Sequence, residues 1–314
     1  MRFCGRVWRG PLQGASRAVN RDRAIIAHKL ENSLALTYPR ERLQILVAVD
    51  GAGDNTHEIV REYAGRGVEL SHSQTRRGKT AAINRAVPLA RGEIVVFSDA
   101  NNLYGEDTLR ELVAPFADPT VGAVSGEKTI LRGDGTLGET EGLYWKYESS
   151  IKEQETRLGC CTGVSGEALA IRRDLFGPLP ENIINDDFYL AMQVIRRGYR
   201  VLYAPRARSF ERVSPTSQHE IERRARIIAG RYQAIAWAHR LLPFNRPFVL
   251  WQVVSHKFLR PLVPLAMIGA LIATLTALIW PPPSASLPLL YLAPPYNWIM
   301  LGLPLAQTLL KFGV

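Results

Sequence analysis

The stretch 97–102, FSDANN, sets Asp99 and Asn101 one residue apart, just after the apolar run 94–97. Carboxylate and amide oxygens are hard ligands of the kind that Mg²⁺ and Mn²⁺ prefer, and Mg²⁺ usually takes one or two carboxylates beside phosphate oxygens. Asp99 could equally cap the turn or helix that follows. The motif therefore leaves two interpretations open, a cation site and a capped turn.

Two further stretches in the first third of the chain could meet a phosphorylated ligand. Residues 50–56, DGAGDNT, contain Asp50 and Asp54, although Asp and Gly are also what an ordinary turn requires. Residues 76–84, RRGKTAAIN, bring Arg77 and Lys79 to a predicted helix start, where cations and backbone N–H groups can both bind phosphate. The spacing of a P-loop is absent, and a solvated basic turn is the alternative.

Charged residues in the second half allow a similar pair of interpretations. Asp186 and Asp187 precede a predicted helix, where they could cap it or supply a general base for an attacking hydroxyl. The segment 222–230, ERRARIIAG, could present arginines to a diphosphate leaving group or line a surface that faces a membrane.

Alternating strands and helices are expected to position these residues. Apolar runs that end in polar residues at 43–50, 68–73 and 93–99 are each followed by a helical pattern, and an amphipathic helix precedes them with Ile26, Leu30 and Leu34 on one face. This alternation predicts an α/β fold with a mostly parallel sheet covered by helices. Ligands then bind at the carboxyl ends of the strands, where Asp50 and Asp99 fall.

The C-terminal part of the 314 residues differs sharply from the rest. The chain carries a net charge of +10, yet no charged side chain occurs between Pro261 and Leu310. Residues 261–280 are long and apolar enough for a transmembrane helix, and 296–310 could form a second, shorter one. The arginines and lysines that precede residue 261 predict a cytoplasmic location for the N-terminal domain, tethered to the membrane. Three cysteines without metal-ligand spacing agree with a reducing compartment, and no nucleic-acid motif accompanies the basic charge.

Taken in order, the motifs resemble those of family 2 glycosyltransferases with the GT-A fold. The series runs from the Asp-rich turn, the Lys-containing helix start and the strand ending in Asp-x-Asn to Asp-Asp and a basic helix before a membrane span, over about residues 22–260. The expected domains are an atypical basic segment 1–21, a GT-A domain 22–240, an interfacial helix 241–260 and a membrane region 261–314.

On the donor side, the resemblance implies roles for six residues and a cation. VAVDGAGDNT is similar to V-D-G-S-x-D-x-T, so Asp50 would contact the base or ribose and Asp54 would order the loop. GKTAAIN is similar to G-K-x-x-A-L-N, which brings Lys79 and Asn84 to the nucleotide. SDAN stands at the D-x-D position, where Asp99 and Asn101 would hold Mg²⁺ or Mn²⁺ beside a nucleotide-diphospho-sugar.

On the acceptor side, the resemblance implies a base and a diphosphate contact. GVSGEALAIRR, with Gly166 and Arg172, is similar to the acceptor segment, and NDD stands where the family has T-E-D, which makes Asp187 the expected base beside Asp186. RRARI stands at Q-x-x-R-W, with Arg226 at the position of its Arg and Arg223 at that of its Gln. The implied reaction is an inverting transfer of sugar, from a UDP-sugar in preference, to a hydroxyl of a glycan or lipid-linked acceptor in polysaccharide synthesis.

Three departures from the family pattern qualify this expectation. Asn101 removes one charge from the D-x-D position, and Arg223 and Ile227 replace Gln and Trp, which argues against a processive polymerase. Residues 1–20 contain four Arg and no acid and are expected to form neither a strand nor a signal peptide. Family members begin with an apolar strand, so this chain is expected to be truncated at its N-terminus. It would then lack the first strand of the fold and leave an unpaired sheet edge, and an inactive membrane-anchored protein is the alternative.

Overall fold

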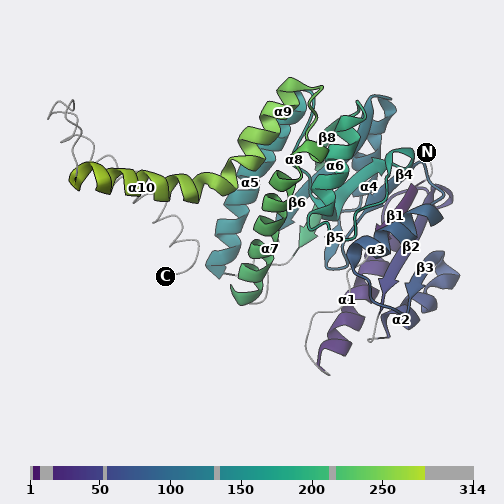
Figure 1. Cartoon of the computed structure of the whole chain (residues 1–314). Coiled ribbons are helices and arrows are strands. Elements are labelled where there is room, and N and C mark those ends of the chain that lie inside the picture. The colour runs from purple at the N-terminus through teal and green to yellow at the C-terminus, as the bar shows by residue number, and fades with distance from the viewer. Residues whose placement is uncertain (1–2, 8–16, 52–54, 131–134, 212–216, 280–314) are drawn as a thin grey trace. The chain divides into compact units, whose positions relative to one another are not determined.

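The computed structural model describes residues 3–7, 17–51, 55–130, 135–211 and 217–279, which divide into two compact units, 1–253 and 254–314. In the described part of the first unit, the strands form one eight-stranded mixed sheet in the order β3-β2-β1-β4-β7-β6-β8-β5 (Figure 1). The strands are β1 (Phe3–Val7), β2 (Leu43–Asp50), β3 (Val68–Ser73), β4 (Ile94–Phe97), β5 (Asn102–Tyr104), β6 (Val121–Ile130), β7 (Leu169–Arg172) and β8 (Arg200–Glu211).

Helices cover this sheet in the alternation that the sequence predicts, and the expected α/β fold is confirmed. Helices α2 and α3 follow the strands β2 and β3, and α4 follows the short strand β5. The helices of the first unit are α1 (Arg17–Leu34), α2 (Thr56–Glu62), α3 (Lys79–Ala86), α4 (Thr108–Val113), α5 (Gly135–Arg157), α6 (Asp186–Arg196), α7 (Ser217–Ala236), α8 (Ala238–Leu241) and α9 (Pro247–Val253).

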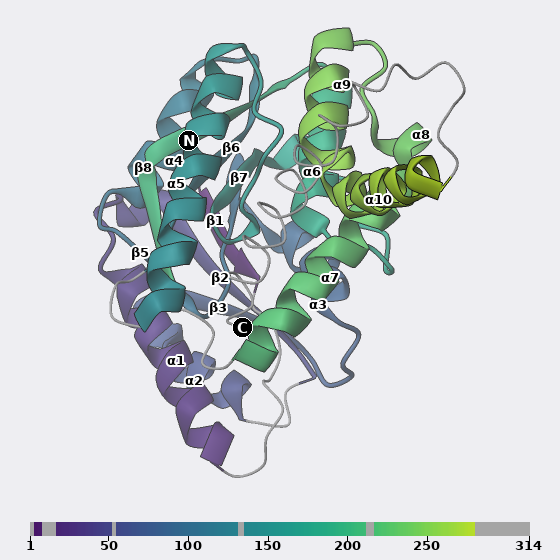
Figure 2. The same ribbon diagram turned by 90° about the vertical axis from the view of Figure 1, so that its left-hand side faces the viewer.

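Strand β1 corrects the expectation that residues 1–21 contain no strand. Phe3–Val7 pairs in parallel with β2 on one side and β4 on the other, so it lies inside the sheet and no edge is left open there (Figure 2). FCGRV has neither an apolar run nor a clear alternation, and the sequence pattern therefore missed it. Its two neighbours are strongly apolar, and pairing with both can override weak local propensity.

The core consists of apolar clusters that the alternating strand residues build with the helices. Ile26, Leu30 and Leu34 of α1 are buried against alternate residues of β2, which confirms the predicted amphipathic face. A second cluster surrounds Phe116, which is 1% exposed, and joins β4, α4 and β6. The eight residues 43–50 are buried after the first because both faces of this strand are covered.

Strand direction gathers polar residues at one edge of the sheet. β1, β2, β3 and β4 run parallel, and β6 and β8 run in the same direction because two antiparallel steps through β7 separate β4 from β6. The carboxyl ends of β2, β4 and β8 therefore meet at this edge, which also receives the start of β7. We call this edge, with the loops that leave it, the carboxyl edge.

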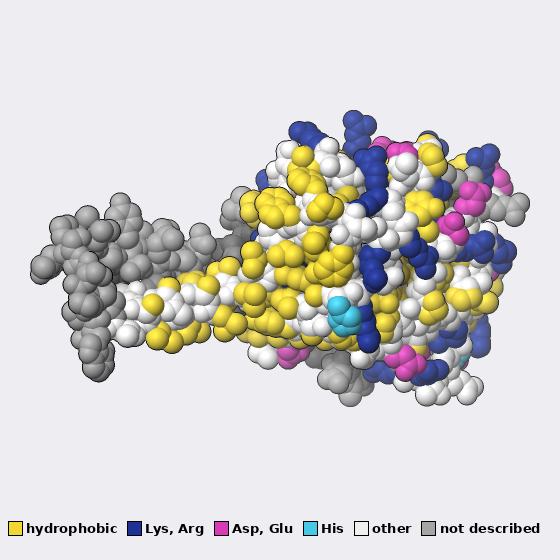
Figure 3. All heavy atoms as spheres, turned by 45° about the horizontal axis from the view of Figure 1, so that its top comes forward, with side chains coloured by type: hydrophobic (Ala, Val, Ile, Leu, Met, Phe, Trp, Pro, Cys, Tyr) yellow, Lys and Arg dark blue, Asp and Glu magenta, His cyan; other side chains and the backbone are white. Residues whose placement is uncertain are grey.

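The second unit contains α10 (Val263–Ile279). Within the described residues, one helical stretch, Pro247–Thr276, is long and apolar enough to cross a membrane, with a mean hydropathy of 1.9. Hydrophobic side chains are exposed along α10, whereas Lys and Arg side chains stand out on the first unit (Figure 3). The described helix agrees with the predicted span 261–280, and the predicted span 296–310 lies outside the described residues.

Candidate active site

Asp50, the last residue of β2, fixes the loop that leads into α3. Its carboxylate is 3% exposed, and Oδ2 accepts the backbone N–H groups of Arg77 at 2.8 Å and Gly78 at 2.5 Å. Gly51 has φ +59°, and a Cβ there would overlap Arg76, so the two loops touch through their backbones. Asp50 thus lies at the carboxyl edge as predicted, where Oδ2 binds the protein backbone and Oδ1 lies 3.5 Å from Arg85 Nη1. Asp54 lies outside the described residues.

Lys79 joins the strand ends to the start of α6. Its Nζ lies 2.6 Å from Asp186 Oδ2 and 3.9 Å from Asp99 Oδ1. The three side chains are 19%, 12% and 19% exposed, so this contact is largely removed from solvent. Lys79 and Asp186 are more than a hundred positions apart in the chain. Their motifs predict that they share one site, and the structure brings them together.

The turn after Asp99 is held by the neighbouring strands. Asn101 Nδ2 donates to Glu211 Oε1 at the end of β8, at 2.6 Å. The next residue, Asn102, is fully buried: its Oδ1 accepts from Lys29 at 2.8 Å, and its Nδ2 donates to Ser209 at 2.6 Å. The sequence did not predict this network, because the hydrogen-bond partners of Asn102 lie 73 and 107 residues away in the chain.

Asp187 lies against Gly166 at the N-terminus of α6. A Cβ on Gly166 would come within 3.1 Å of Asp187 Cβ and 3.4 Å of its Oδ2. Asp187 Oδ1 accepts the backbone N–H of Phe188 at 2.8 Å, and a helix N-terminus favours an ionised carboxylate. The acceptor segment at Gly166 and the predicted base Asp187, which are separate in the sequence, are therefore in contact.

Helix α7 packs beside the loop that leads to this base. Asn185 Nδ2 donates to the carbonyl of Ile227 at 3.4 Å, and Gly230 leaves no room for a Cβ next to Asn185. On the same helix Arg223 is partly buried and Arg226 is exposed. The basic helix is therefore an immediate neighbour of the segment 182–187.

Two residues that the motifs assigned to the site are engaged elsewhere. Arg172 ends β7 and pairs in register with Ile94, the first residue of β4, so antiparallel pairing carries it to the opposite edge of the sheet, where it donates to three backbone carbonyls. Its assignment to the acceptor and diphosphate side is therefore wrong. Asn84 exchanges two hydrogen bonds of 2.8 Å with the backbone of Leu179, and these ties secure the segment that follows β7.

A buried charged cluster, which the motifs did not reveal, adjoins the turn at Asp99. Lys128 on β6 contacts Glu167 at 3.1 Å and also pairs with Glu211, and it lies 5.3 Å from the ring centroid of Trp145. Its side chain and that of Glu167 are 6% and 9% exposed. The alternation of β6 could have located Lys128 on a covered face, but its two carboxylate partners come from distant segments.

Burial shifts the pKa of two groups on β6 and β8. Desolvation raises the pKa of the Glu127 carboxyl above its usual value, and the positive charges of Arg208 and Lys152 only partly offset this. Desolvation also raises the pKa of Tyr203 to about 12, so this phenol stays protonated at neutral pH. At both groups, therefore, the effect of burial exceeds that of the neighbouring charges.

The site fits a cation that takes most of its ligands from phosphate. Within the described residues, no group of three or more His, Cys, Asp or Glu side chains is placed to hold a metal ion alone. Asp99 offers one carboxylate and Asn101 one amide oxygen, since its NH₂ group is already directed to Glu211. Mg²⁺ commonly binds through one or two carboxylates plus substrate phosphates, and this donor set agrees with that preference.

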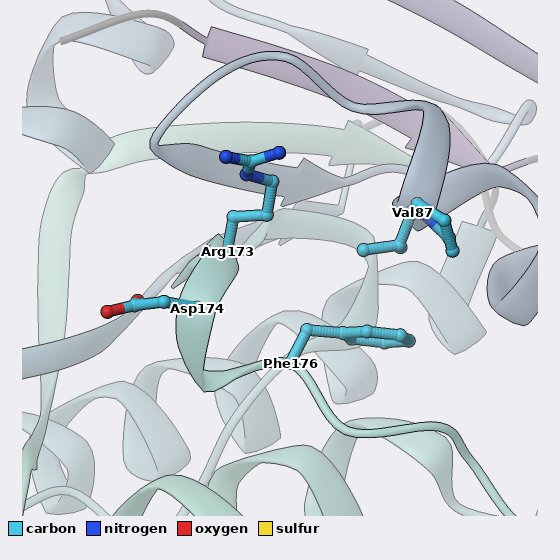
Figure 4. Close-up of a pocket in the computed structure, with 5 residues that line it drawn as sticks. Val87, Arg173, Asp174 and Phe176 are labelled. Atoms are coloured by element: carbon cyan, nitrogen blue, oxygen red, sulfur yellow. The ribbon is translucent and has the colours of Figure 1, made fainter.

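A surface hollow of about 240 Å³ lies apart from these residues. Val87, Pro88, Arg173, Asp174 and Phe176 line it, and Figure 4 shows Phe176 facing Val87 while Asp174 points away. Arg173 donates to the carbonyl of Ala90 at 2.8 Å, before the start of β4. The hollow therefore adjoins the edge opposite to Asp99 and is not part of the candidate active site.

Comparison with known proteins agrees with this arrangement. The model of the family described as glycosyl transferase family 2 matches residues 18–177, just over half of the chain. Poly-beta-1,6-N-acetyl-D-glucosamine synthase of Staphylococcus aureus is 27% identical over 219 residues, which are 67% of this chain and 52% of that protein. Beta-monoglucosyldiacylglycerol synthase of Trichormus variabilis is 28% identical over 56% of this chain and 40% of its own length. The chain thus spans about half the length of these relatives or less.

Solved structures extend the likeness over nearly all residues. The mannosyltransferase PcManGT from Pyrobaculum calidifontis, in complex with GDP-Man and Mn²⁺, matches with a TM-score of 0.69 and 26% identity over 99% of this chain and 84% of that one. TarS 1–349 of S. aureus, in complex with UDP, shares the fold at a TM-score of 0.52 and 19% identity, over 74% and 65%. With the family match over half its length and the GT-A architecture around its strand ends, the chain belongs to glycosyl transferase family 2.

Proposed function

We propose that the protein transfers a sugar from a nucleotide-diphospho-sugar to a hydroxyl acceptor, with inversion at the anomeric carbon. The observation that carries this proposal is the convergence of Asp99, Lys79 and Asp186 within 4 Å contacts at the carboxyl edge, beside Asp187 and Gly166. Family membership adds support, since the relatives named above include synthases of a glycan and of a glycolipid.

The donor diphosphate would occupy the region of Lys79 and Asp99. Lys79 presents a cation at a helix start, and its ammonium group can exchange its carboxylate partners for phosphate oxygens. Asp99, with the amide oxygen of Asn101, would hold Mg²⁺ or Mn²⁺, which stabilises negative charge on the leaving diphosphate. Arg226 and Arg223 on α7 are candidates for a further contact with this diphosphate.

Asp187 would accept the proton of the attacking hydroxyl. Asp186 is already paired with Lys79, and the contact with Gly166 sets the Asp187 carboxylate beside the acceptor loop. Deprotonation by a positioned carboxylate typically contributes about 10²–10⁴-fold to the rate. The hydroxyl oxygen attacks the anomeric carbon, the bond to the diphosphate breaks, and the proton passes to Asp187.

A panel of donors tests this proposal. Membranes that carry the chain are incubated with UDP- and GDP-sugars and Mn²⁺ or Mg²⁺, and release of nucleoside diphosphate is measured for the wild type, Asp187→Asn and Asp174→Asn. We expect release from one donor class, UDP-sugars in preference, and a loss of about 10²–10⁴-fold in Asp187→Asn alone. Asp174→Asn is the matched control, because Asp174 is exposed and lies at the opposite edge. A folded chain that releases nothing from any donor would instead support the inactive, membrane-anchored alternative.

The membrane part of the proposal places the active site on the cytoplasmic side. The stretch Pro247–Thr276 would anchor the chain, and the many arginines before it in the sequence favour cytoplasmic retention of the first unit. The acceptor would then be a glycan or a lipid-linked sugar within reach of the membrane, in envelope or extracellular polysaccharide synthesis. Retention of the protein in membranes washed at alkaline pH is the expected result, and its release would contradict the anchor.

A further inference from the structure

Asn101, which stands where the family pattern has the second Asp of D-x-D, is held by a carboxylate from another strand. Its Nδ2 donates to Glu211 Oε1 at 2.6 Å. We propose that Glu211 is a positioning residue of the cation site: it supplies the negative charge that Asn101 lacks and leaves the amide oxygen of Asn101 to ligate the ion. This role rests on the proposed function and deepens it.

The sheet itself fixes where Glu211 stands. Glu211 pairs with Asn102 in the β5–β8 ladder and with Ile130 in the β6–β8 ladder. Its Cα is therefore set by backbone pairing on both sides and does not depend on the side-chain contact with Asn101. An outer carboxylate that orients a metal ligand requires this kind of rigid support.

The surrounding charges leave Glu211 with a negative charge to contribute. Lys128 is the cation described beside it, and Lys128 is shared with Glu167 at 3.1 Å. This ammonium and the two carboxylates carry a net charge of −1 together, and the nearby buried ammonium of Lys29 is held by the side chain and the carbonyl oxygen of Asn102. The side chains of Lys128, Glu167 and Glu211 are 6%, 9% and 17% exposed, so solvent screens this charge from the turn at Asp99 only in part.

A purely structural role for Glu211 makes a different prediction. If Glu211 only holds the turn to β8 by its hydrogen bond with Asn101, Gln at this position would preserve that bond, since an amide oxygen can also accept the Asn101 N–H. If its charge matters, Glu211→Gln would weaken cation binding while the fold stays intact. Exchanging the groups, in the double variant Asn101→Asp with Glu211→Gln, returns the charge to the D-x-D position and keeps a hydrogen bond between them.

Binding of Mn²⁺ to the full-length protein in detergent, followed by its EPR signal in the presence of UDP and separately of GDP, tests this role. We expect Glu211→Gln to weaken Mn²⁺ binding about 10- to 100-fold, as is typical for outer-shell partners of metal ligands. The double variant is expected to recover most of the affinity. Glu106→Gln serves as a matched control on an exposed carboxylate, and thermal unfolding without Mn²⁺ verifies that each variant is folded.

Three results would overturn the role of Glu211. They are wild-type protein that binds no Mn²⁺ with either nucleotide, a folded Glu211→Gln variant with unchanged affinity, and a folded double variant that binds no better than Glu211→Gln. Because no acceptor is present, binding is measured apart from sugar transfer. A chain that shows the expected binding pattern but transfers no sugar would contradict the proposed function and still support the role of Glu211.

Discussion

The two sides of the carboxyl edge hold their polar side chains in different ways. On the donor side, Asp50 accepts two backbone N–H groups and Asn84 exchanges two hydrogen bonds with the backbone of Leu179. On the acceptor side, charged side chains hold one another: Asp186 pairs with Lys79, which reaches it from the donor side, and Glu167 pairs with Lys128. Backbone partners are fixed by the fold, whereas side-chain partners can be exchanged.

This difference separates residues that shape the site from residues that respond to a ligand. A carboxylate bound to backbone N–H groups cannot leave them without loosening a loop. An ammonium group paired with carboxylates can pair with a diphosphate instead at little cost in free energy, because one anion replaces another. We therefore expect substitutions on the donor side to act first on stability, and substitutions on the acceptor side to act first on binding and rate.

Asp50→Asn should produce the largest loss of stability. The carboxylate accepts two N–H groups of the loop before α3 while 3% exposed, and hydrogen bonds to a charged group contribute about 1.5–3 kcal/mol each. Asn places an uncharged amide there, so both hydrogen bonds lose their charge-assisted part and the pairing of Oδ1 with Arg85 at 3.5 Å is lost. We expect the free energy of unfolding to fall by about 2–3 kcal/mol in urea titrations. Ser73→Ala is the control at the same edge, since Ser73 donates only to a nearby carbonyl, and an equal loss in both variants would contradict this comparison.

Gly166→Ala tests whether the contact with Asp187 sets the rate. The added methyl would lie 3.1 Å from Asp187 Cβ, so the carboxylate must move by a few tenths of an ångström. A small displacement of the proposed base slows the reaction, and we expect kcat to fall about tenfold, or about 1.4 kcal/mol. Donor affinity should change less than kcat.

Gly65→Ala is the matched control for this variant. A Cβ at Gly65 meets nothing within 4 Å, so kcat should stay at the wild-type value. Equal kcat values for Gly166→Ala and wild type, in steady-state assays with the donor that the panel of UDP- and GDP-sugars identifies, would show that this contact does not set the position of Asp187.

Lys79→Gln should reduce stability by a smaller amount that depends on salt. The lysine pairs with Asp186 at 2.6 Å and both side chains are mostly buried, whereas the Arg66–Glu31 pair is about half exposed. Exposed pairs contribute little, so we expect almost no change for Arg66→Gln and a loss of about 1 kcal/mol for Lys79→Gln. Thermal unfolding at two ionic strengths measures this, and equal losses in the two variants would mean that the Lys79 pair is no stronger than a surface pair.

Local sequence patterns were sufficient to predict several strands and the residues that share a site. Residues 43–50 and 68–73 were predicted as strands and are strands with the same bounds, because strong apolar runs end there in polar turns. Residues Asp99, Lys79 and Asp186 were placed at one site by the order of their motifs, and the structure brings them into contact.

What the sequence could not supply depends on pairing between distant segments. Strand β1 has no apolar pattern of its own and exists through two neighbours, and Arg172 lies at the far edge because β7 runs antiparallel. Neither strand direction nor the partners of Lys128 can be read from spacing, since register alone decides which distant side chains meet. The assignment of Asp187 as base is still a prediction.

Lowering the pH should produce the smallest of these effects on stability, through His72 at the end of β3 on the donor side. His72 stacks on His57 with ring centroids 4.5 Å apart, and burial, followed by the charge of His57, lowers the pKa of His72 below 6.5. The unfolded chain then binds this proton more readily than the folded one, so stability should fall as the pH drops from about 6.5 to the lowered folded pKa. Below that window His72 adds no further loss.

His72→Gln removes this contribution and should make the fall in stability on acidification shallower, as measured by urea unfolding at a series of pH values. His239→Gln is the control, because His239 is exposed and lies on α8, away from the donor side. If the two variants show the same pH dependence, His72 is as readily protonated in the folded state as in the unfolded one.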